Sequence, residues 1–144
     1  MKITILAVGR LKESHWRAAQ NEYLERLQHF AKVEVRELEE DAQLRASLPA
    51  GAKLVLLDEK APSLDSEAWA AQVIGEAEMR FGAKGLVFAI GGADGLPDAL
   101  RALAWKSISF GKATLPHRLA RVVLLEQIYR AFTILRGLPY HRGG

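Results

Sequence analysis

The sequence contains no cysteine. This absence excludes disulfides, thiolate-bound zinc, iron–sulfur clusters and a cysteine nucleophile. No apolar run approaches the roughly 18 residues that a membrane-spanning helix needs. The opening MKITILAVGRLKES has no small-residue cleavage site, so it is better interpreted as a buried strand than as a signal peptide. We therefore expect a cytoplasmic protein without a membrane segment.

Several signatures of catalysis and binding are missing as well. There is no G-x-S-x-G nucleophile elbow, no G-x-G-x-x-G dinucleotide motif and no G-x-x-x-x-G-K-[ST] phosphate loop. His15 and His29 have no other His, Cys or paired acid at ligand spacing, so we expect no metal site. The acidic run Glu39-Glu40-Asp41 is interpreted as a solvated connection rather than as catalytic carboxylates.

What is present fits a single α/β domain. The chain has 144 residues, a usual length for one domain, so we expect residues 1–144 to form one unit. Apolar or alternating runs predict strands at residues 2–8, 32–38, 53–57, 85–90 and 107–110. Helical spacing predicts helices at residues 14–30, 67–81, 97–103 and 118–135. This alternation predicts a mainly parallel sheet with helices on both faces and the strand at 32–38 near an edge.

Three of these helices carry more specific predictions. Ser14 is the expected cap of the first helix, and Ser63 or Ser66 of the second. In the second helix, Trp69, Val73, Ile74 and Met79 are expected to face the core. The last helix is apolar nearly all round, which requires burial of more than one face. In so small a domain we expect its second face to meet another subunit, in a homodimer.

The charge is unevenly distributed along the chain. Residues 1–100 contain twelve Lys and Arg against sixteen Asp and Glu, whereas residues 101–144 contain eight Lys and Arg against one acid. One interpretation is a solvated surface whose sign changes along the chain. The other is a polyanion partner whose phosphates the basic segment neutralises.

Three loops that leave strand ends are candidates for a ligand pocket. They are Leu57-Asp58, Gly91 to Gly95 and Gly111 to Pro116. In open α/β sheets, ligands bind beyond the carboxyl ends of the strands, so we expect a small-molecule pocket there. The closing Arg136 to Arg142 segment combines cations, a tyrosine and a histidine. It is interpreted either as a disordered end or as an RNA contact.

Three motifs together resemble a known family. They are the GGADG after a strand, the long run SFGKATLPHRLARVVLLEQIYRAFTI and the closing PYHR. The chain resembles the SPOUT methyltransferases over its whole length, and most of all the large-subunit ribosomal RNA pseudouridine N3-methyltransferases (the RNA methyltransferase H family). GGADG replaces the GGPEG form associated with that family. The chain is short between Leu38 and Lys53, where some members are longer, and we assign that connection no function.

The resemblance implies a fold, a cofactor and a reaction. The C-terminal segment of the chain would form a trefoil knot. The loops of this knot would hold S-adenosylmethionine in a bent shape, within a homodimer. The reaction would methylate N3 of a pseudouridine in 23S (large-subunit) ribosomal RNA, on the assembled ribosome. The absence of cysteine is consistent with N3, because methylation of a pyrimidine at C5 generally needs a cysteine, whereas N3 needs only positioning and a proton acceptor.

The resemblance also assigns residues. The cofactor site would comprise Leu57, Gly91, Gly92, Gly111, Lys112, Ala113, Thr114, Leu115 and Pro116. The substrate side would use His117, Arg121, Arg130 and Arg142. His141 is the candidate proton acceptor and Tyr140 the candidate for stacking on the base, and some of these residues could reach across the dimer. Two alternatives stay open: a non-catalytic RNA- or ribosome-binding dimer, and an α/β enzyme acting on a small acidic metabolite.

Overall fold

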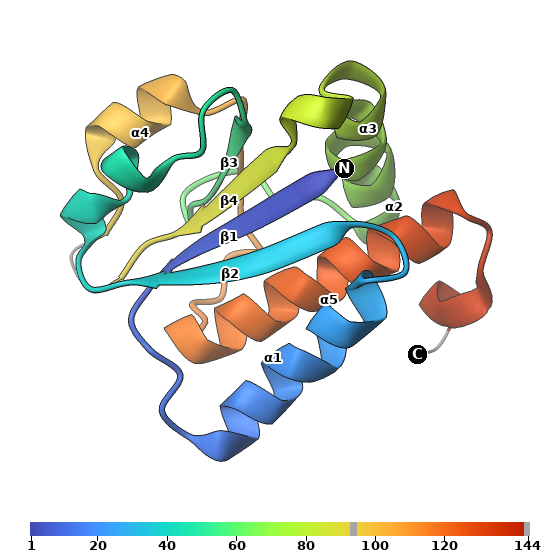
Figure 1. The fold of residues 1–144 in the computed structure, drawn as a ribbon, viewed down its shortest axis with the longest axis horizontal. Coiled ribbons are helices and arrows are strands. Elements are labelled where there is room, and N and C mark those ends of the chain that lie inside the picture. Colours follow the sequence, from blue (N-terminus) through green and yellow to red (C-terminus); the bar gives the residue numbers. More distant parts are fainter. Residues whose placement is uncertain (93–94, 143–144) are drawn as a thin grey trace.

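A five-stranded parallel sheet forms the centre of the molecule (Figure 1). The computed structural model describes residues 1–92 and 95–142, so Ala93-Asp94 of the GGADG motif and Gly143-Gly144 lie outside the described residues. The strands run in the order β2-β1-β4-β3-β5, and every pair is parallel. Their bounds are β1 Lys2–Val8, β2 Lys32–Leu38, β3 Lys53–Leu57, β4 Leu86–Ile90 and β5 Lys106–Ile108. The predicted parallel sheet and the edge position of β2 are confirmed.

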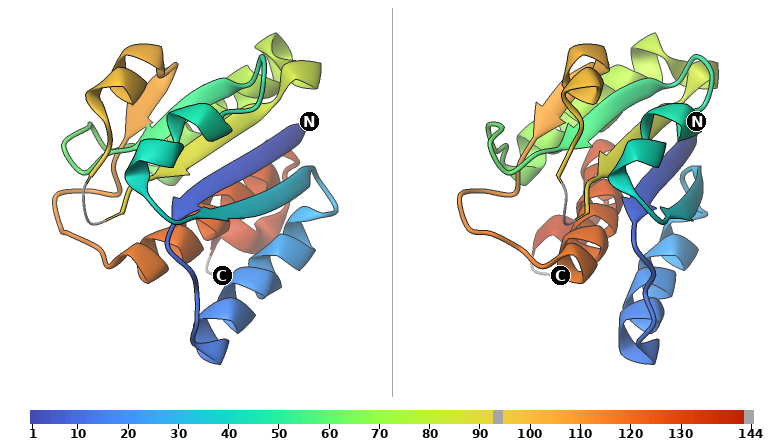
Figure 2. Two further views of the ribbon diagram at one scale, coloured as in Figure 1. Left: turned by 60° about the vertical axis from the view of Figure 1, so that its left-hand side comes forward. Right: turned by 90° about the vertical axis from the view of Figure 1, so that its left-hand side faces the viewer.

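Helices cover both faces of this sheet, as predicted. One face packs against α1, α5 and the continuous helical segment α2-η3-α3; the other packs against the turns η1 and η2 and against α4. Figure 2 shows α1 and α5 side by side along one face. The bounds are α1 Ser14–Leu27, η1 Asp41–Gln43, η2 Arg45–Ser47, α2 Ser66–Ala68, η3 Trp69–Gly75, α3 Glu76–Arg80, η4 Gly82–Lys84, α4 Asp98–Leu103, α5 His117–Leu135 and η5 Pro139–Arg142.

The predicted helix caps were wrong. The first helix begins at Ser14 itself, so its cap position falls on Glu13, and the helix ends at Leu27 rather than near residue 30. The second helix is capped by Asp65, whose carboxylate accepts a hydrogen bond of 2.8 Å from the N–H of Ala68. Asp is as good a cap as Ser, and the sequence offered three candidates within four residues.

The orientation of Met79 was also predicted wrongly. Trp69, Val73 and Ile74 are buried as expected, but Met79 is 88% exposed. The reason is that η3 is a π-helix, whose turns are wider than those of an α-helix. Each wide turn shifts the residues that follow around the helix axis. The 3.6-residue period therefore fails for the residues beyond η3.

The second face of α5 is covered largely by the chain itself. α5 packs against α1 on one side and against η3 on the other, and Leu124, Leu125, Ile128 and Phe132 are fully buried. An apolar strip of Leu119, Val122 and Val123 at helical spacing remains only half-buried. The apolar circumference of α5 therefore does not by itself require a partner subunit. None of the helices in the described part of the chain is long and apolar enough to cross a membrane.

Candidate functional site

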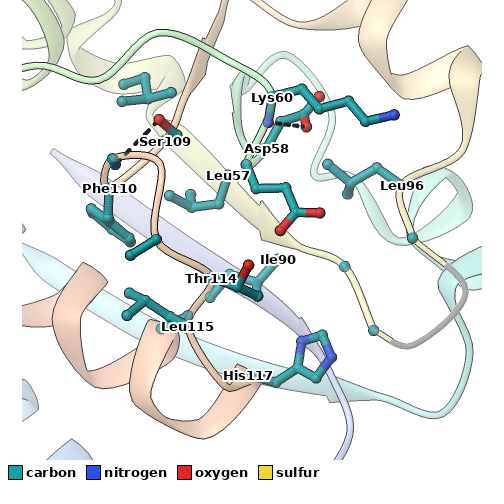
Figure 3. Close-up of a pocket in the computed structure, with 18 of the residues that line it drawn as sticks. Leu57, Asp58, Lys60, Ile90, Leu96, Ser109, Phe110, Thr114, Leu115 and His117 are labelled. Carbon is teal, nitrogen blue, oxygen red and sulfur yellow. Dashed lines mark hydrogen bonds between the residues drawn. The ribbon is translucent and has the colours of Figure 1, made fainter.

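A cavity of about 530 Å³ opens at the carboxyl ends of β3, β4 and β5. Leu57 and Ile90, at the ends of β3 and β4, lie between Phe110 and Leu115 on one side and Leu96 on the other (Figure 3). The lining combines these apolar side chains with charged and polar groups, and the volume falls in the range of small-molecule sites. It lies where the three candidate loops were predicted to converge.

The loop after β4 is fixed to the rest of the protein by Asp41. The Asp41 carboxylate accepts a hydrogen bond from the backbone N–H of Gly92, and the residue is only 5% exposed. A Cβ on Gly92 would lie 2.7 Å from Cγ1 of Val8, so no side chain fits there without displacing its neighbours. The interpretation of Asp41 as solvated was therefore wrong. Only its neighbours Glu39 and Glu40 are exposed.

The loop between β5 and α5 forms another wall of the cavity. Gly111 has a φ of +112°, a conformation that favours glycine, and its N–H donates a hydrogen bond of 3.3 Å to the Ser109 hydroxyl. Ala113, Thr114 and Leu115 line the cavity after this turn. Seven of the nine predicted cofactor residues are therefore brought together: Leu57, Gly91, Gly92, Gly111, Ala113, Thr114 and Leu115. Lys112 and Pro116 belong to the same loop but do not line the cavity.

Asp58 and Arg101 join two further loops at the rim. Arg101 contacts the Asp58 carboxylate at 3.0 Å and that of Asp98 at 2.7 Å. Burial opposes the ionisation of Asp58, but hydrogen bonds from Arg101 and from the N–H of Lys60 outweigh it and hold the pKa of Asp58 below its usual value. Asp58 is thus an anion at neutral pH and orders the rim. No sequence pattern pointed to a role for Arg101 at the cavity, because Asp58 lies 43 residues away along the chain.

His117 is the predicted substrate residue that does reach this cavity. It begins α5 and lines the pocket, and its imidazole lies on the side of the cavity away from Phe110 in Figure 3. Among the described residues, no group of three or more His, Cys, Asp or Glu could hold a metal ion.

The predicted catalytic residues lie elsewhere in the single chain. Tyr140 and His141 belong to η5, beyond the C-terminal end of α5, whereas His117 and the cavity lie at its start. The 19 residues of α5 span about 27 Å at 1.5 Å per residue. One chain therefore does not bring its own tail to its own cavity.

The tail is docked against α1 and α5. The Tyr140 ring meets the Tyr129 ring edge-on at a centroid distance of 4.7 Å, and the Arg130 guanidinium lies 5.1 Å from the Tyr140 ring. Partial burial and the hydroxyl of Tyr23, 3.4 Å away, raise the pKa of the Tyr140 phenol, which stays protonated at neutral pH. His141 Nδ1 lies 3.1 Å from the carbonyl oxygen of Leu138. The expectation of a disordered end is not met for residues 139–142, which form η5.

The remaining predicted substrate residues differ in how available they are. Arg121 is 4% exposed and donates hydrogen bonds to Glu37, at 2.6 Å, and to the carbonyl of Gly9, at 3.0 Å. Arg130 pairs with Glu126 at 2.6 Å and is partly exposed. Arg142 is exposed. In the single chain Arg121 joins β2, α5 and the loop after β1, and it presents little surface to a substrate.

Comparison with known proteins gives one consistent picture. A family model described as "Predicted SPOUT methyltransferase" matches residues 1–141. A protein of Rhodopseudomonas palustris (strain ATCC BAA-98 / CGA009) is 44% identical over 161 aligned positions that cover 99% of both chains. A protein of Geobacter sp. (strain M21) is 40% identical over 154 positions, covering 98% of this chain and 99% of that one. Both relatives are named Ribosomal RNA large subunit methyltransferase H.

Proposed function

The chain belongs to the SPOUT methyltransferase family, and we propose that it methylates N3 of a pseudouridine in large-subunit ribosomal RNA, with S-adenosylmethionine as methyl donor. The names of the relatives support a ribosomal RNA substrate. The assembled ribosome is the proposed form of that substrate, and it would place the protein in the cytoplasm. The chemistry of the cavity supports the donor.

The residues that line the cavity fit S-adenosylmethionine. Leu57, Ile90 and Leu115 offer apolar surface to a purine ring, and the backbone of Gly91 and Gly92 also lines the cavity. A drug-sized ligand needs a cavity of roughly 300–1,000 Å³, and this one falls within that range. Asp58 is an anion paired with Arg101, and both line the cavity, so the rim offers a carboxylate and a guanidinium to the ammonium and the carboxylate of the donor. When bound, the cofactor supplies an electrophilic methyl group on a sulfonium.

A dimer would complete the site. The tail of one chain lies about one α5 length from its own cavity, so we propose that it serves the cavity of a second copy. The half-buried apolar strip Leu119, Val122 and Val123 lies near the start of α5, close to the cavity, and is the proposed contact. Two-fold pairing would place the tail of each chain at the cavity of its partner, because the same surface of both copies forms a two-fold interface.

Within such a composite site the tail has two proposed tasks. His141 would accept the N3 proton of the pseudouridine, directly or through a water, which would make N3 nucleophilic toward the donor's methyl group, with the donor's sulfur leaving as a neutral thioether. Its imidazole is partly exposed, and its Nδ1 lies by the Leu138 carbonyl, which would leave Nε2 as the basic nitrogen. Arg142 is exposed and suited to a phosphate, as is Arg130 at its partly exposed edge. Tyr140 keeps its proton and offers an aromatic surface to the base.

The C-terminal trefoil knot of the family is proposed on resemblance. Such knots are rare exceptions to the rule that chains do not thread loops. Gly91, Gly92 and Gly95 line the cavity together with Gly111 and Ala113 to Leu115, and the knot would lie here.

The observation that carries the proposal is the cavity itself, formed by seven of the predicted cofactor residues. Titration calorimetry with S-adenosylmethionine tests it. We expect saturable binding by wild-type protein, and loss of binding on Gly92→Asp, since a Cβ at Gly92 already meets Val8 and a carboxylate would add repulsion from Asp41. No binding by a folded wild-type protein would leave the alternative of a non-catalytic ribosome-binding dimer.

A further inference from the structure

The amino-terminal edge of the sheet carries cations that the proposed reaction does not use. Because the strands are parallel, all five begin at this edge, and the cavity lies at the opposite one. Four strands begin with a lysine: Lys2, Lys32, Lys53 and Lys106. Lys84 comes two residues before the fifth, β4. The edge therefore has a lysine at or next to the start of every strand.

Two aromatic rings lie among these cations. Phe81 and Trp105 meet edge-on at 4.9 Å and 87°. The Lys53 ammonium lies 5.3 Å and the Arg80 guanidinium 5.2 Å from the centre of the Phe81 ring. Lys106 lies 4.9 Å from the Trp105 ring. Cation–π contacts of this kind restrict long basic side chains to a few positions. We call Lys53, Arg80, Lys84 and Lys106, with Phe81 and Trp105, the amino-end patch.

Few acids offset the charge of the amino-end patch. Glu76 pairs with Lys106 at 3.7 Å. Lys53, Arg80 and Lys84 are exposed and form no ion pair with any acid in residues 1–92 and 95–142. Like charges that lie within a Debye length of about 8 Å reinforce one another's potential. With Lys106 paired to Glu76, the other three cations still leave the patch positive, which favours a polyanion.

The patch and the C-terminal tail lie at the same end of the molecule (Figure 1). Arg136, just beyond α5, pairs with Glu78 of α3 at 2.9 Å, and α3 ends at Arg80 in the patch. The patch is separated from its own chain's cavity by the length of β3, about 13 Å over four steps of 3.3 Å. A dimer that brings a tail to its partner's cavity would bring the patch toward that cavity as well.

We propose that the amino-end patch is a docking surface for ribosomal RNA, with Lys53, Arg80 and Lys84 contacting backbone phosphates away from the target nucleotide. This inference rests on the proposed function, in which the partner is already an RNA. The patch is open and spans the starts of β3, β4 and β5, which suits an extended polyanion better than a small anion. These contacts would add to the phosphate contacts proposed for Arg130 and Arg142.

The test compares two triple variants of equal charge change. In the patch variant Lys53→Gln, Arg80→Gln and Lys84→Gln are combined. In the control Lys12→Gln, Arg17→Gln and Arg45→Gln are combined, because these three are also exposed cations without an ion pair among the described acids. Binding to purified large ribosomal subunits is measured between 50 and 200 mM salt, with calorimetry of S-adenosylmethionine alongside. Each lost phosphate contact should lower the salt slope by about 1, so the patch variant should lose about 2–3 and bind at least ~10-fold more weakly.

The outcomes separate the docking surface from the methyltransferase activity. A reduced slope in the patch variant alone, with cofactor affinity unchanged, supports the docking surface. Equal slopes in the patch variant and the control overturn it, even where the wild type methylates RNA. A wild type that fails to transfer methyl groups but keeps the patch-dependent slope refutes the activity and leaves the surface standing. Loss of binding to poly-glutamate without any loss on ribosomal subunits would assign the patch to an acidic protein and overturn the RNA assignment.

Discussion

The carboxylate of Asp41 accepts a hydrogen bond from the backbone N–H of Gly92. The two residues lie on different connections, one after β2 and one after β4, and β1 separates those strands in the sheet. The bond therefore connects Gly92, in the loop after β4 that lines the cavity, to η1, the turn that follows the edge strand β2. It connects a segment with no assigned function to the proposed cofactor site.

Replacing Asp41 should weaken cofactor binding. Asp41→Ala leaves the Gly92 N–H without its charged acceptor, a loss of about 1.5–3 kcal/mol, and part of this should appear as a roughly 10-fold weaker affinity for S-adenosylmethionine. Asp41→Asn keeps an acceptor oxygen and should lose less. Calorimetry gives the affinities, and Glu39→Ala, an exposed neighbour, is the matched control. Equal affinity in wild type and Asp41→Ala would show that the loop is held by other contacts.

Replacing Gly92 should reduce the affinity for the cofactor more than replacing Gly91, because a side chain has less room at Gly92. A Cβ at Gly92 would lie 2.7 Å from Val8, whereas a Cβ at Gly91 would lie 3.2 Å from the flexible side chain of Leu96. Gly92→Ala should therefore reduce cofactor affinity more than Gly91→Ala, by about 1–2 kcal/mol, a typical cost of a local clash in a packed site. The reverse order would contradict this account of the loop.

Arg121 should be a stability residue in the single chain. Arg121→Met removes the cation that faces Glu37 and Gly9, and we expect the free energy of unfolding to fall by about 2–4 kcal/mol. Chemical denaturation at pH 7 measures this. Arg118→Met is the control, because Arg118 forms an exposed pair with Glu13 and should change stability by less than about 1 kcal/mol. A variant as stable as wild type would free Arg121 for a role in substrate binding.

The stability that Arg121 contributes should decrease at acidic pH. Burial opposes the ionisation of Glu37, but the hydrogen bonds from Arg121 and from the N–H of Leu11 hold its pKa below the usual value. A lowered pKa contributes stability that is present above the unfolded pKa, about 4.3, and is lost as the pH falls through the folded value. The stability difference between wild type and Arg121→Met should therefore shrink below about pH 4. A difference that stays constant down to pH 3 would contradict the pairing.

If the site is shared between two chains, two inactive variants should restore activity when they form mixed dimers. A Gly92→Asp protein lacks a cofactor cavity, and a chain ending at Leu138 lacks the tail, so each alone should be inactive. Coexpression would give mixed dimers with one intact cavity facing one intact tail. Random pairing should then restore about a quarter of the wild-type sites. Methyl transfer by the mixture measures it, and no recovery in a confirmed mixed dimer would mean that each chain uses its own tail.

Patterns along the chain predicted the sheet and the cavity well. The strands are apolar runs whose burial follows directly from composition, and the loops at their carboxyl ends must meet because the strands are parallel. That is why seven predicted cofactor residues line one cavity. The resemblance, rather than spacing, supplied the identity of the cofactor and of the reaction.

Two predictions failed because the environment of a residue depends on more than its local sequence pattern. Asp41 looks like part of an acidic run, and only its approach to Gly92 buries it. Met79 follows helical spacing, and only the π-helix before it turns it outward. Tyr140 and His141 were expected on the substrate side, with a reach across the dimer left open; α5 separates them from the cavity of their own chain, so that expectation stays a prediction. Local patterns carry no information on any of these arrangements.

The most direct measurement is methyl transfer from radiolabelled S-adenosylmethionine to ribosomes that lack the modification. Free ribosomal RNA and ribosomes with uridine at the target position run beside them, with the Gly92→Asp protein as control. We expect label in the large-subunit RNA of intact ribosomes, recovered after digestion as N3-methylpseudouridine. We expect no labelled RNA with the control protein. Cofactor binding without any transfer to ribosomes, or label at a position other than N3 of pseudouridine, would contradict it.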